Sequence, residues 1–309
     1  LRGGRRGTLN HGFTYVGIIG PRDQGRPLLE YLSARYAHTL EEEWRQRIAA
    51  GRVLVDDAAI GADAFLARGQ RVAWVRPPWE EPEAPLSFAV LFEDEDLAAV
   101  AKPSGLPTNP GAGFLEHTLL HLVRLRYPGA SPVHRLGRGT SGLVLFARTE
   151  EANRALCATL REHRATKIYR ALVEGRPAED AFTVDTPIGP VPHAALGTVH
   201  AASPQGKAAR SHVKVLERRE GSSLVEVRIE TGRPHQIRIH MAACGHPLAG
   251  DPLYAAGGGI RKDTTALPGD IGYLLHAFRL ELPHPRTGAR LALECEPPLV
   301  LRSFGNSEL

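Results

Sequence analysis

Three glycines in residues 134–142 (HRLGRGTSG) have the G-x-G-x-x-G spacing of a dinucleotide-binding loop. Such a loop binds pyrophosphate only where a helix begins directly after the last glycine, because the helix N-terminus supplies amide donors. Here residues 143–147 (LVLFA) follow at once, and this short apolar run is typical of a buried strand. The spacing therefore does not indicate a nucleotide cofactor, and we expect none.

His117 and His121 have the spacing that places two metal ligands on one helical face. However, Thr118 stands where a zinc protease has glutamate, and no third ligand is suggested, so ordinary helical histidines are the better interpretation. The cysteines are far apart and form no C-x-x-C pair: Cys157, Cys244 and Cys295. We therefore expect no metal site, no disulfide framework and a reduced, cytoplasmic location.

The elements that would position these residues alternate between strands and helices from residue 86 onward. Strand patterns occur at 88–92, 97–100, 143–147, 211–216 and 224–230. One helix is predicted from apolar residues at helical spacing and ends before Pro128, and another has Thr149 as its N-cap. In 224–230, apolar and charged residues alternate, as in a sheet with one buried face. This order predicts an α+β domain.

The first 80 residues have a different pattern. Residues 1–25 are rich in arginine and glycine without sustained periodicity, which predicts an extended basic arm. Pro27 suits the first position of a helix, and Thr39 to Glu42 reads as a capping box ahead of a second helix that Gly51 ends. Short strands are predicted at 52–55 and 71–75. A proline-rich, acidic stretch then predicts a stiff linker at 78–85.

Length and charge set broad limits. The chain has 309 residues, which is enough for one large and one small domain. Its net charge of +4 comes mainly from arginine, a residue that binds phosphate in a bidentate manner, although a solvated basic surface explains the charge equally well. No apolar run approaches the roughly 20 residues of a membrane span, so we expect no membrane association.

Several stretches occur in the order typical of RluA-type RNA pseudouridine synthases, and residues 88–300 resemble that family. In chain order they are 102–107 (KPSGLP), 134–142 (HRLGRGTSG), 167–171 (KIYRA), 230–240 (ETGRPHQIRIH), 245–254 (GHPLAGDPLY) and 275–280 (LHAFRL). Several ordered matches are more specific than any single motif. The N-terminal helices and strands resemble, over about 50 residues, the alpha-L RNA-binding module that often precedes such domains.

The resemblance implies a mixed, mostly antiparallel central sheet and isomerisation of uridine to pseudouridine in RNA without a cofactor. It implies that an aspartate in the signature is the indispensable catalytic group, that Tyr169 packs against the target base, and that Arg238 pairs with the aspartate. A base that must leave the RNA stack needs an aromatic face and a basic rim. We place RNA contacts at His134, Arg135, Arg138, Thr140, Arg233, His235 and Gln236.

Gly137 occupies the position of the signature aspartate. Glycine offers no nucleophile, base or charge, and it leaves Arg238 without its expected partner, at a cost of several kcal/mol if the cation is buried. Three interpretations stay open. Another carboxylate, with Glu230 and Asp251 nearest by motif, takes over catalysis; the pocket binds RNA without modifying it; or Arg238 is solvated or displaced.

Two hypotheses on function follow. The first is an RNA uridine isomerase that acts as a monomer on structured rRNA or tRNA, and the second is a catalytically silent RNA-binding protein. A nucleotide-dependent oxidoreductase is a distant third. We predict an arm at 1–25, an alpha-L-like module at 26–77, the linker at 78–85 and a pseudouridine-synthase-like catalytic domain at 86–309.

Overall fold

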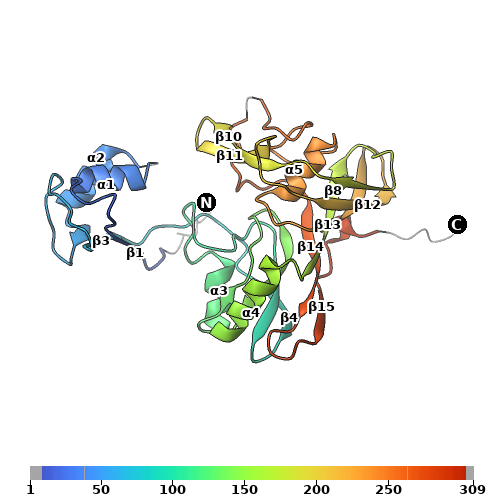
Figure 1. Ribbon diagram of the computed structural model, residues 1–309, viewed down its shortest axis with the longest axis horizontal. Helices are drawn as coiled ribbons and strands as arrows, with labels where there is room; N and C mark the ends of the chain where they lie inside the picture. Colours follow the sequence, from blue (N-terminus) through green and yellow to red (C-terminus); the bar gives the residue numbers. More distant parts are fainter. Residues whose placement is uncertain (1–8, 38, 263, 304–309) are drawn as a thin grey trace, which may run out of the picture. The chain divides into compact units, whose positions relative to one another are not determined.

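A computed structural model describes residues 9–37, 39–262 and 264–303, and the chain divides into two compact units, 1–81 and 82–309 (Figure 1). The N-terminal unit joins two helices to a three-stranded antiparallel sheet of order β1-β3-β2. Its elements are β1 (Phe13–Ile18), α1 (Leu28–Arg35), α2 (Glu41–Ala49), β2 (Val53–Val55) and β3 (Arg71–Arg76). Buried side chains such as Leu28, Trp44 and Val53 give this unit a core of its own.

Strand β1 corrects the predicted arm over residues 1–25. Phe13–Ile18 pairs with Arg71–Arg76, and the ring of Tyr15 stacks on Trp74 with centroids 4.8 Å apart. The strand is short and contains β-branched and aromatic residues, but the glycines and arginines around it dominate the composition and favour an irregular segment. Residues 1–8 of the predicted arm lie outside the described residues.

Two further predictions for the N-terminal unit are wrong in detail. The linker does not begin at residue 78, because the Asn10 side chain donates to Glu81 Oε1 at 2.8 Å and accepts from the Trp79 amide at 3.0 Å. The capping box is also absent: Leu40 is the N-cap of α2, and no side chain caps this helix. Gly51 does follow the helix as predicted, with a φ of 67° that favours glycine.

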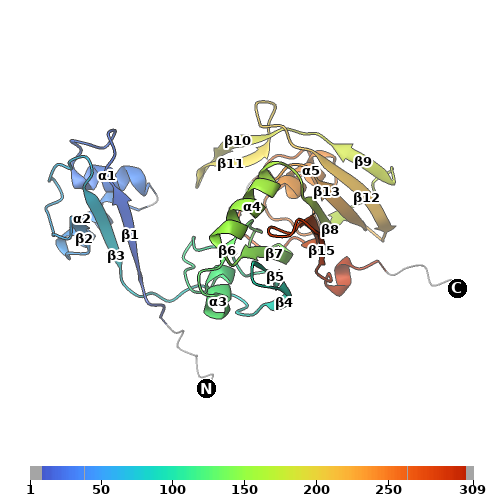
Figure 2. The same ribbon diagram turned by 60° about the horizontal axis from the view of Figure 1, so that its bottom comes forward.

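The C-terminal unit is built on a ten-stranded sheet that is mixed and mostly antiparallel, as the resemblance implies. The strand order is β4-β5-β7-β14-β8-β13-β12-β9, with β15 beside β14 and β6 beside β7; β12, β13 and β8 lie next to one another in Figure 2. Among the described residues, β7 and β14 form a parallel pair, and the other strand pairs of this sheet are antiparallel. The strands are β4 (Ala89–Glu93), β5 (Leu97–Lys102), β6 (Ser131–Pro132), β7 (Ser141–Ala147), β8 (Thr166–Glu174), β9 (Ala181–Val184), β12 (Ser211–Arg218), β13 (Ser222–Ile229), β14 (Leu275–Pro283) and β15 (Arg290–Glu294).

Helices cover both faces of this sheet. They are α3 (Leu119–Arg126), α4 (Glu150–Arg161) and α5 (Gln236–Ala243), with a short 3-10 helix at Leu299–Leu301 and a separate hairpin of β10 (Ile188–His193) and β11 (Gly197–Ala202). Successive β7 residues point to opposite faces, so Val144 packs toward α3 and Leu145 toward α4. Thr149 caps α4 as predicted, because its hydroxyl accepts from the Ala152 amide at 3.1 Å. None of the helices in the described ranges is long and apolar enough to cross a membrane.

The parallel contact at the centre of the sheet depends on a glycine. Gly142 pairs with Ala277, and its φ of 109° is one that L side chains rarely adopt. A Cβ at this position would lie 2.6 Å from the Ala277 amide nitrogen, well inside van der Waals contact. The last glycine of the signature therefore permits the close approach of β7 to β14 and is not part of a nucleotide-binding loop.

Candidate active site

A pocket of about 110 Å³ lies over the middle of the sheet. Four segments that are far apart in the sequence supply its walls: the loop before β7, strand β8, the segment from the end of β13 into α5, and the start of β14. The lining residues are Arg135, Leu136, Gly137, Thr140, Tyr169, Ile229, Arg233, His235, Gln236, Ile237, Arg238, Tyr273 and Leu275. They include three arginines and no carboxylate, so the pocket suits an anionic ligand such as RNA.

Residues of the first motif, 102–107 (KPSGLP), hold the signature loop through hydrogen bonds to its backbone. The Lys102 ammonium donates to the Arg138 carbonyl at 3.2 Å, and the Ser104 hydroxyl donates to the Gly139 carbonyl at 2.7 Å. The Gly105 amide donates to the Arg138 carbonyl at 2.8 Å. Burial lowers the pKa of Lys102 to about 7. These contacts fix the loop backbone, so the absence of a side chain at residue 137 does not imply a collapsed loop.

The backbone at Gly137 is compatible with an L side chain. Its φ lies outside the left-handed region, unlike that of Gly142. A Cβ built on Gly137 would lie 3.0 Å from the Tyr273 hydroxyl oxygen and 3.7 Å from Thr140 Oγ1. The nearest obstacle is therefore the tip of one side chain, which a small displacement of Tyr273 would clear.

Arg238 is fully buried and paired, which corrects the expectation that Gly137 leaves it alone. Its Nε and Nη2 atoms donate to the two carboxylate oxygens of Asp251 at 2.7 and 2.8 Å, and Nη1 donates to the Pro268 carbonyl at 3.1 Å. The exposed fractions of the two side chains are 2% and 0%. Burial alone would raise the pKa of Asp251, but the hydrogen bonds and charge of Arg238 outweigh it and hold that pKa below its usual value.

The hypothesis that Asp251 or Glu230 replaces the signature aspartate fails on this geometry. Neither residue lines the pocket. Besides Arg238, Asp251 Oδ1 accepts from the amides of Leu253 and Tyr254 at 2.9 and 3.1 Å, so the carboxylate is an anchor without access to a substrate. Glu230 instead accepts from His212 Nε2 at 2.6 Å and is partly exposed.

Aromatic rings surround the arginine and the pocket. The Arg238 guanidinium carbon lies 4.1 Å from the Tyr273 ring centroid and 4.9 Å from that of Tyr254, distances at which cation–π attraction stabilises a desolvated cation. Tyr169 lies on β8 opposite Ala277 of β14. Burial raises the pKa of Tyr169 to about 12, so its phenol stays neutral at physiological pH. The pocket therefore offers a fixed cation and two tyrosine side chains.

Comparison with known proteins decides the family. A family model described as RNA pseudouridylate synthase matches residues 96–243. An uncharacterized RNA pseudouridine synthase of Synechocystis is 42% identical over 273 residues, which cover 88% of this chain and 94% of that protein. RNA pseudouridine synthase 5 of Arabidopsis thaliana is 41% identical, with 89% and 90% covered. The chain belongs to the RNA pseudouridine synthase family.

Further relatives agree with an RluA-type pseudouridine synthase. Ribosomal large subunit pseudouridine synthase D of Neisseria meningitidis is 36% identical over 86% of this chain and 75% of that protein. Among solved structures, human RNA pseudouridylate synthase domain containing 1 superimposes with a TM-score of 0.56 at 26% identity, covering 71% of this chain and 86% of that one. Family and fold are those of an isomerase.

In this pseudouridine synthase, five of the seven residues predicted to bind RNA line the pocket and two do not. His134 faces away, because its Nε2 accepts from the Leu145 amide at 3.2 Å. Burial, assisted by the charge of Lys167, lowers the pKa of His134 to about 4. Arg138 Nε donates to the Gly269 carbonyl at 3.0 Å. The signature His and second Arg therefore shape the loop, whereas Arg135 projects into solvent at the pocket.

Gln236 and His235 are both held by neighbouring groups. Gln236 makes four hydrogen bonds, to Arg210, Ser211, Thr231 and Arg233, and is buried, so it fixes the turn before α5. His235 Nδ1 lies 2.7 Å from the Tyr254 hydroxyl oxygen.

The hydroxyl group of Tyr254 sets the tautomer of His235. Because that hydroxyl donates to the His200 carbonyl at 2.8 Å, its oxygen accepts from His235 Nδ1, and His235 Nε2 is left as an acceptor. Burial and the charge of Arg238 lower the pKa of His235 to about 3, so the ring is neutral. Among the predicted RNA contacts, His235 thus brings a neutral acceptor nitrogen to the pocket.

Sequence reasoning missed Tyr273 in this synthase. It lies two residues before the LHAFRL stretch, in a segment that no family motif covers, and its exposed fraction is 4%. Its hydroxyl lies 3.2 Å from that of Thr140 in the signature loop. The signal in the sequence is weak: an aromatic residue two positions ahead of the LHAFRL stretch.

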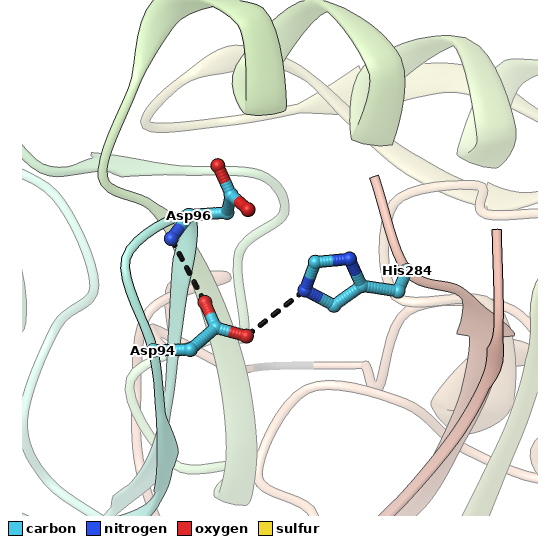
Figure 3. A group of neighbouring side chains, drawn as sticks. All are labelled: Asp94, Asp96 and His284. Carbon is cyan, nitrogen blue, oxygen red and sulfur yellow. Dashed lines mark hydrogen bonds and ion pairs between the residues drawn. The ribbon is translucent and has the colours of Figure 1, made fainter. Parts of the chain in front are cut away.

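One cluster outside the pocket has metal-ligand chemistry: Asp94, Asp96 and His284 (Figure 3). His284 Nδ1 accepts from the amides of Arg286 and Thr287, so its Nε2 carries the proton and donates to Asp94 Oδ2 at 2.9 Å. The carboxylate of Asp96 pairs with the Arg286 guanidinium at 2.7 Å. Because protein groups already bind these atoms and neutralise Asp96, the cluster is a structural link between the turn after β4 and the end of β14.

The predicted helical histidine pair also separates. Helix α3 begins at Leu119, and Thr118 is its N-cap, with its hydroxyl accepting from the His121 amide at 3.2 Å. His117 therefore precedes the helix, and its Nδ1 contacts the Pro82 carbonyl at 2.9 Å. The expectation that both are helical histidines is therefore wrong for His117, and the two rings do not share a helical face.

Proposed function

We propose that the protein binds a uridine flipped out of folded RNA in this pocket and isomerises it to pseudouridine. One observation carries the proposal: four of the six motif stretches supply residues to one pocket, with Tyr169 and Arg238 in its wall. The high identity to proteins named RNA pseudouridine synthases, over most of their length, supports the same activity. A base can reach such a pocket only after it leaves the stack, which costs a few kcal/mol.

The reaction breaks the bond between uracil N1 and ribose C1′, forms a bond from C5 to C1′, releases the C5 proton and leaves a proton on N1, so that the product is an isomer of the substrate. In this chain Tyr169 offers an aromatic face to the base, Arg135 and Arg233 offer positive charge, and Asp251 fixes the position of Arg238 and compensates its charge. Among the thirteen lining residues no side chain supplies a carboxylate nucleophile or base. This gap favours a second candidate, RNA binding without isomerisation, whereas the names of the relatives favour the enzyme.

We further propose structured rRNA or tRNA as the substrate, with rRNA favoured by the relatives named ribosomal large subunit pseudouridine synthase D. We also propose that the protein acts as a monomer. The cysteines are free, which supports a reducing compartment such as the cytoplasm.

The test uses cellular RNA labelled with tritium at uridine C5 and separated into rRNA and tRNA fractions. We expect the protein to release tritium from one fraction, with a plateau that reports the number of uridines modified. Binding of labelled RNA without release from either fraction would support the second candidate instead. Failure to bind either fraction at low ionic strength would contradict both candidates, because phosphate contacts give even non-specific binding there.

We also propose that the N-terminal unit assists RNA binding, chiefly through its first residues. Residues 9–81 contain nine arginines and ten carboxylates, whereas residues 1–8 contain three arginines and no acid. On α2, Arg45 and Arg47 already pair with Glu41 and Glu43, at 3.0 and 2.9 Å. The excess positive charge of this unit therefore lies in residues 1–8.

Replacing Arg2, Arg5 and Arg6 by alanine should weaken RNA binding and flatten its salt dependence. Each arginine–phosphate pair contributes about 0.9 to the slope of log K against log salt on a duplex, and about 0.7 on a single strand. The slope should therefore fall by about that amount for each such pair that the replacement removes. The control is Arg45→Ala and Arg47→Ala together, because these arginines are paired with glutamates. An equal fall in slope for both variants would contradict the special role of the first residues.

A further inference from the structure

Tyr273 occupies space that the signature loop leaves open. A Cβ on Gly137 would lie 3.0 Å from the Tyr273 hydroxyl oxygen, and one on Gly139 would lie 2.9 Å from the ring carbon Cζ. On its other side the ring faces the Arg238 guanidinium, at 4.1 Å from centroid to Cζ. Tyr273 is therefore held between a buried cation and two residues without side chains, and a larger residue at either glycine would have to displace it.

The hydroxyls of Tyr273 and Thr140 form an incompletely satisfied pair. Their oxygens are 3.2 Å apart, and within the described ranges neither hydroxyl makes another hydrogen bond. Each hydroxyl carries one proton, and only one of the two protons can lie between the oxygens. One donor and further acceptor capacity remain, and both residues line the pocket. A ligand with oxygen atoms, such as a uracil carbonyl or a ribose hydroxyl, matches this capacity.

We propose that Tyr273 fills the place of the missing side chain at position 137 and that its hydroxyl, paired with Thr140, hydrogen-bonds the flipped uridine. This inference rests on the proposed function, since it assigns a contact within the same pocket. It also makes Gly137 and Tyr273 an interdependent pair. A side chain added at position 137 competes with the Tyr273 hydroxyl for the same space. The contribution of that hydroxyl to RNA binding therefore depends on which residue occupies position 137.

The experiment compares four proteins: the natural chain, Tyr273→Phe, Gly137→Asp and the double variant. Binding is measured at one fixed, low ionic strength with a fluorescent hairpin RNA whose loop contains only uridines. In the natural chain, Tyr273→Phe should weaken binding about two- to tenfold, the effect of one net hydrogen bond. Phenylalanine keeps the ring over Arg238, so the cation–π contact is retained.

In the Gly137→Asp background the effect on binding should disappear or change sign. There the same Tyr273→Phe replacement should leave binding within about twofold or strengthen it, and should raise tritium release, because it removes the oxygen 3.0 Å from the new Cβ. A tyrosine with only a packing role would lower binding by the same factor in both backgrounds, and that result would overturn the inference. So would unchanged binding on Tyr273→Phe in the natural chain.

A matched control distinguishes removal of a hydrogen bond to RNA from a general loss of stability. Tyr127→Phe removes another buried tyrosine hydroxyl, one that binds Glu93 and does not line the pocket. It should lower the free energy of unfolding in urea without changing the dissociation constant for the hairpin. An equal weakening of binding by both variants would overturn the inference. If the natural chain does not bind the hairpin at all, the proposed function itself is contradicted. If it binds equally well with tyrosine or phenylalanine at position 273, only the hydrogen bond assigned to Tyr273 is contradicted.

Discussion

Replacing Gly137 by aspartate should raise the rate of tritium release from C5-labelled RNA by at least about a hundredfold, the lower end of what a positioned acid or base contributes. The natural pocket lines its walls with arginines, tyrosines and aliphatic residues but with no carboxylate. The loop around residue 137 is held by hydrogen bonds that the Lys102 and Ser104 side chains donate to the carbonyls of Arg138 and Gly139, and the φ of Gly137 accepts an L residue. The new carboxylate should therefore enter a preformed site.

The matched control for this replacement is Gly137→Asn, which has nearly the same size and shape but no ionisable group. It should disturb Tyr273 as much as aspartate does, and it should not raise the rate. Equal rates for the two variants would show that bulk rather than a carboxylate limits the reaction. If the natural chain already releases tritium as fast as the Gly137→Asp variant, the carboxylate comes from outside the pocket walls, for instance from a protein side chain that enters the pocket when RNA binds.

Replacing either Arg238 or Asp251 by alanine should lower the free energy of unfolding by about 3–5 kcal/mol, because each change leaves one buried charge without its partner. The two side chains are almost completely buried and make two direct hydrogen bonds. Urea unfolding measures the effect, as a shift of the midpoint at an unchanged slope. An exposed pair such as Arg154 and Glu151 is the contrast, with an expected loss of at most about 1 kcal/mol on removal.

The double variant Arg238→Met with Asp251→Leu tests whether the loss comes from the unpaired charge. Its stability should lie much closer to that of the natural chain than either single variant, because no charge remains to be desolvated. The pH dependence gives a second readout. Since the pKa of Asp251 is depressed in the folded state, its stabilisation is present above the unfolded value of about 3.9 and is lost as pH falls through the folded value. The double variant should lack this acid-sensitive component, and an identical acid transition in both proteins would contradict the assignment.

The pattern of the sequence was enough to place the local elements of the catalytic unit. Strand β7, strand β13 and helix α4 lie where an apolar run, alternation and the Thr149 cap predict them, because each depends on residues that are neighbours in the chain. The mixed, mostly antiparallel sheet came from the family resemblance, which rested on ordered motifs. The convergence of the signature loop, Tyr169 and Arg238 on one pocket was predictable for the same reason.

Contacts between segments that are distant in the chain could not be predicted from the sequence alone. The partner of Arg238 is Asp251, but two acidic residues had equal claims by motif, and only the fold brings one of them to the guanidinium. Tyr273 meets the signature loop across a separation of more than 130 residues, and nothing in its immediate neighbours marks it. The prediction missed strand β1 for a different reason. Its six residues are too few to show a clear strand periodicity, and the surrounding glycines and arginines favoured an irregular segment.

The parallel pairing of β7 with β14 bears on how the protein acquires its site. Contacts between residues so far apart in sequence form late and slowly, since a long loop must close before they contribute any energy. Tyr273 and Leu275 follow the signature strand β7 by more than 120 residues, and both are pocket walls. During synthesis, domains form as the chain emerges from its N-terminal end. A nascent chain surrounded by ribosomal RNA therefore lacks two walls of the pocket until β14 is made, and RNA recognition through this pocket begins only after β14 has joined the sheet.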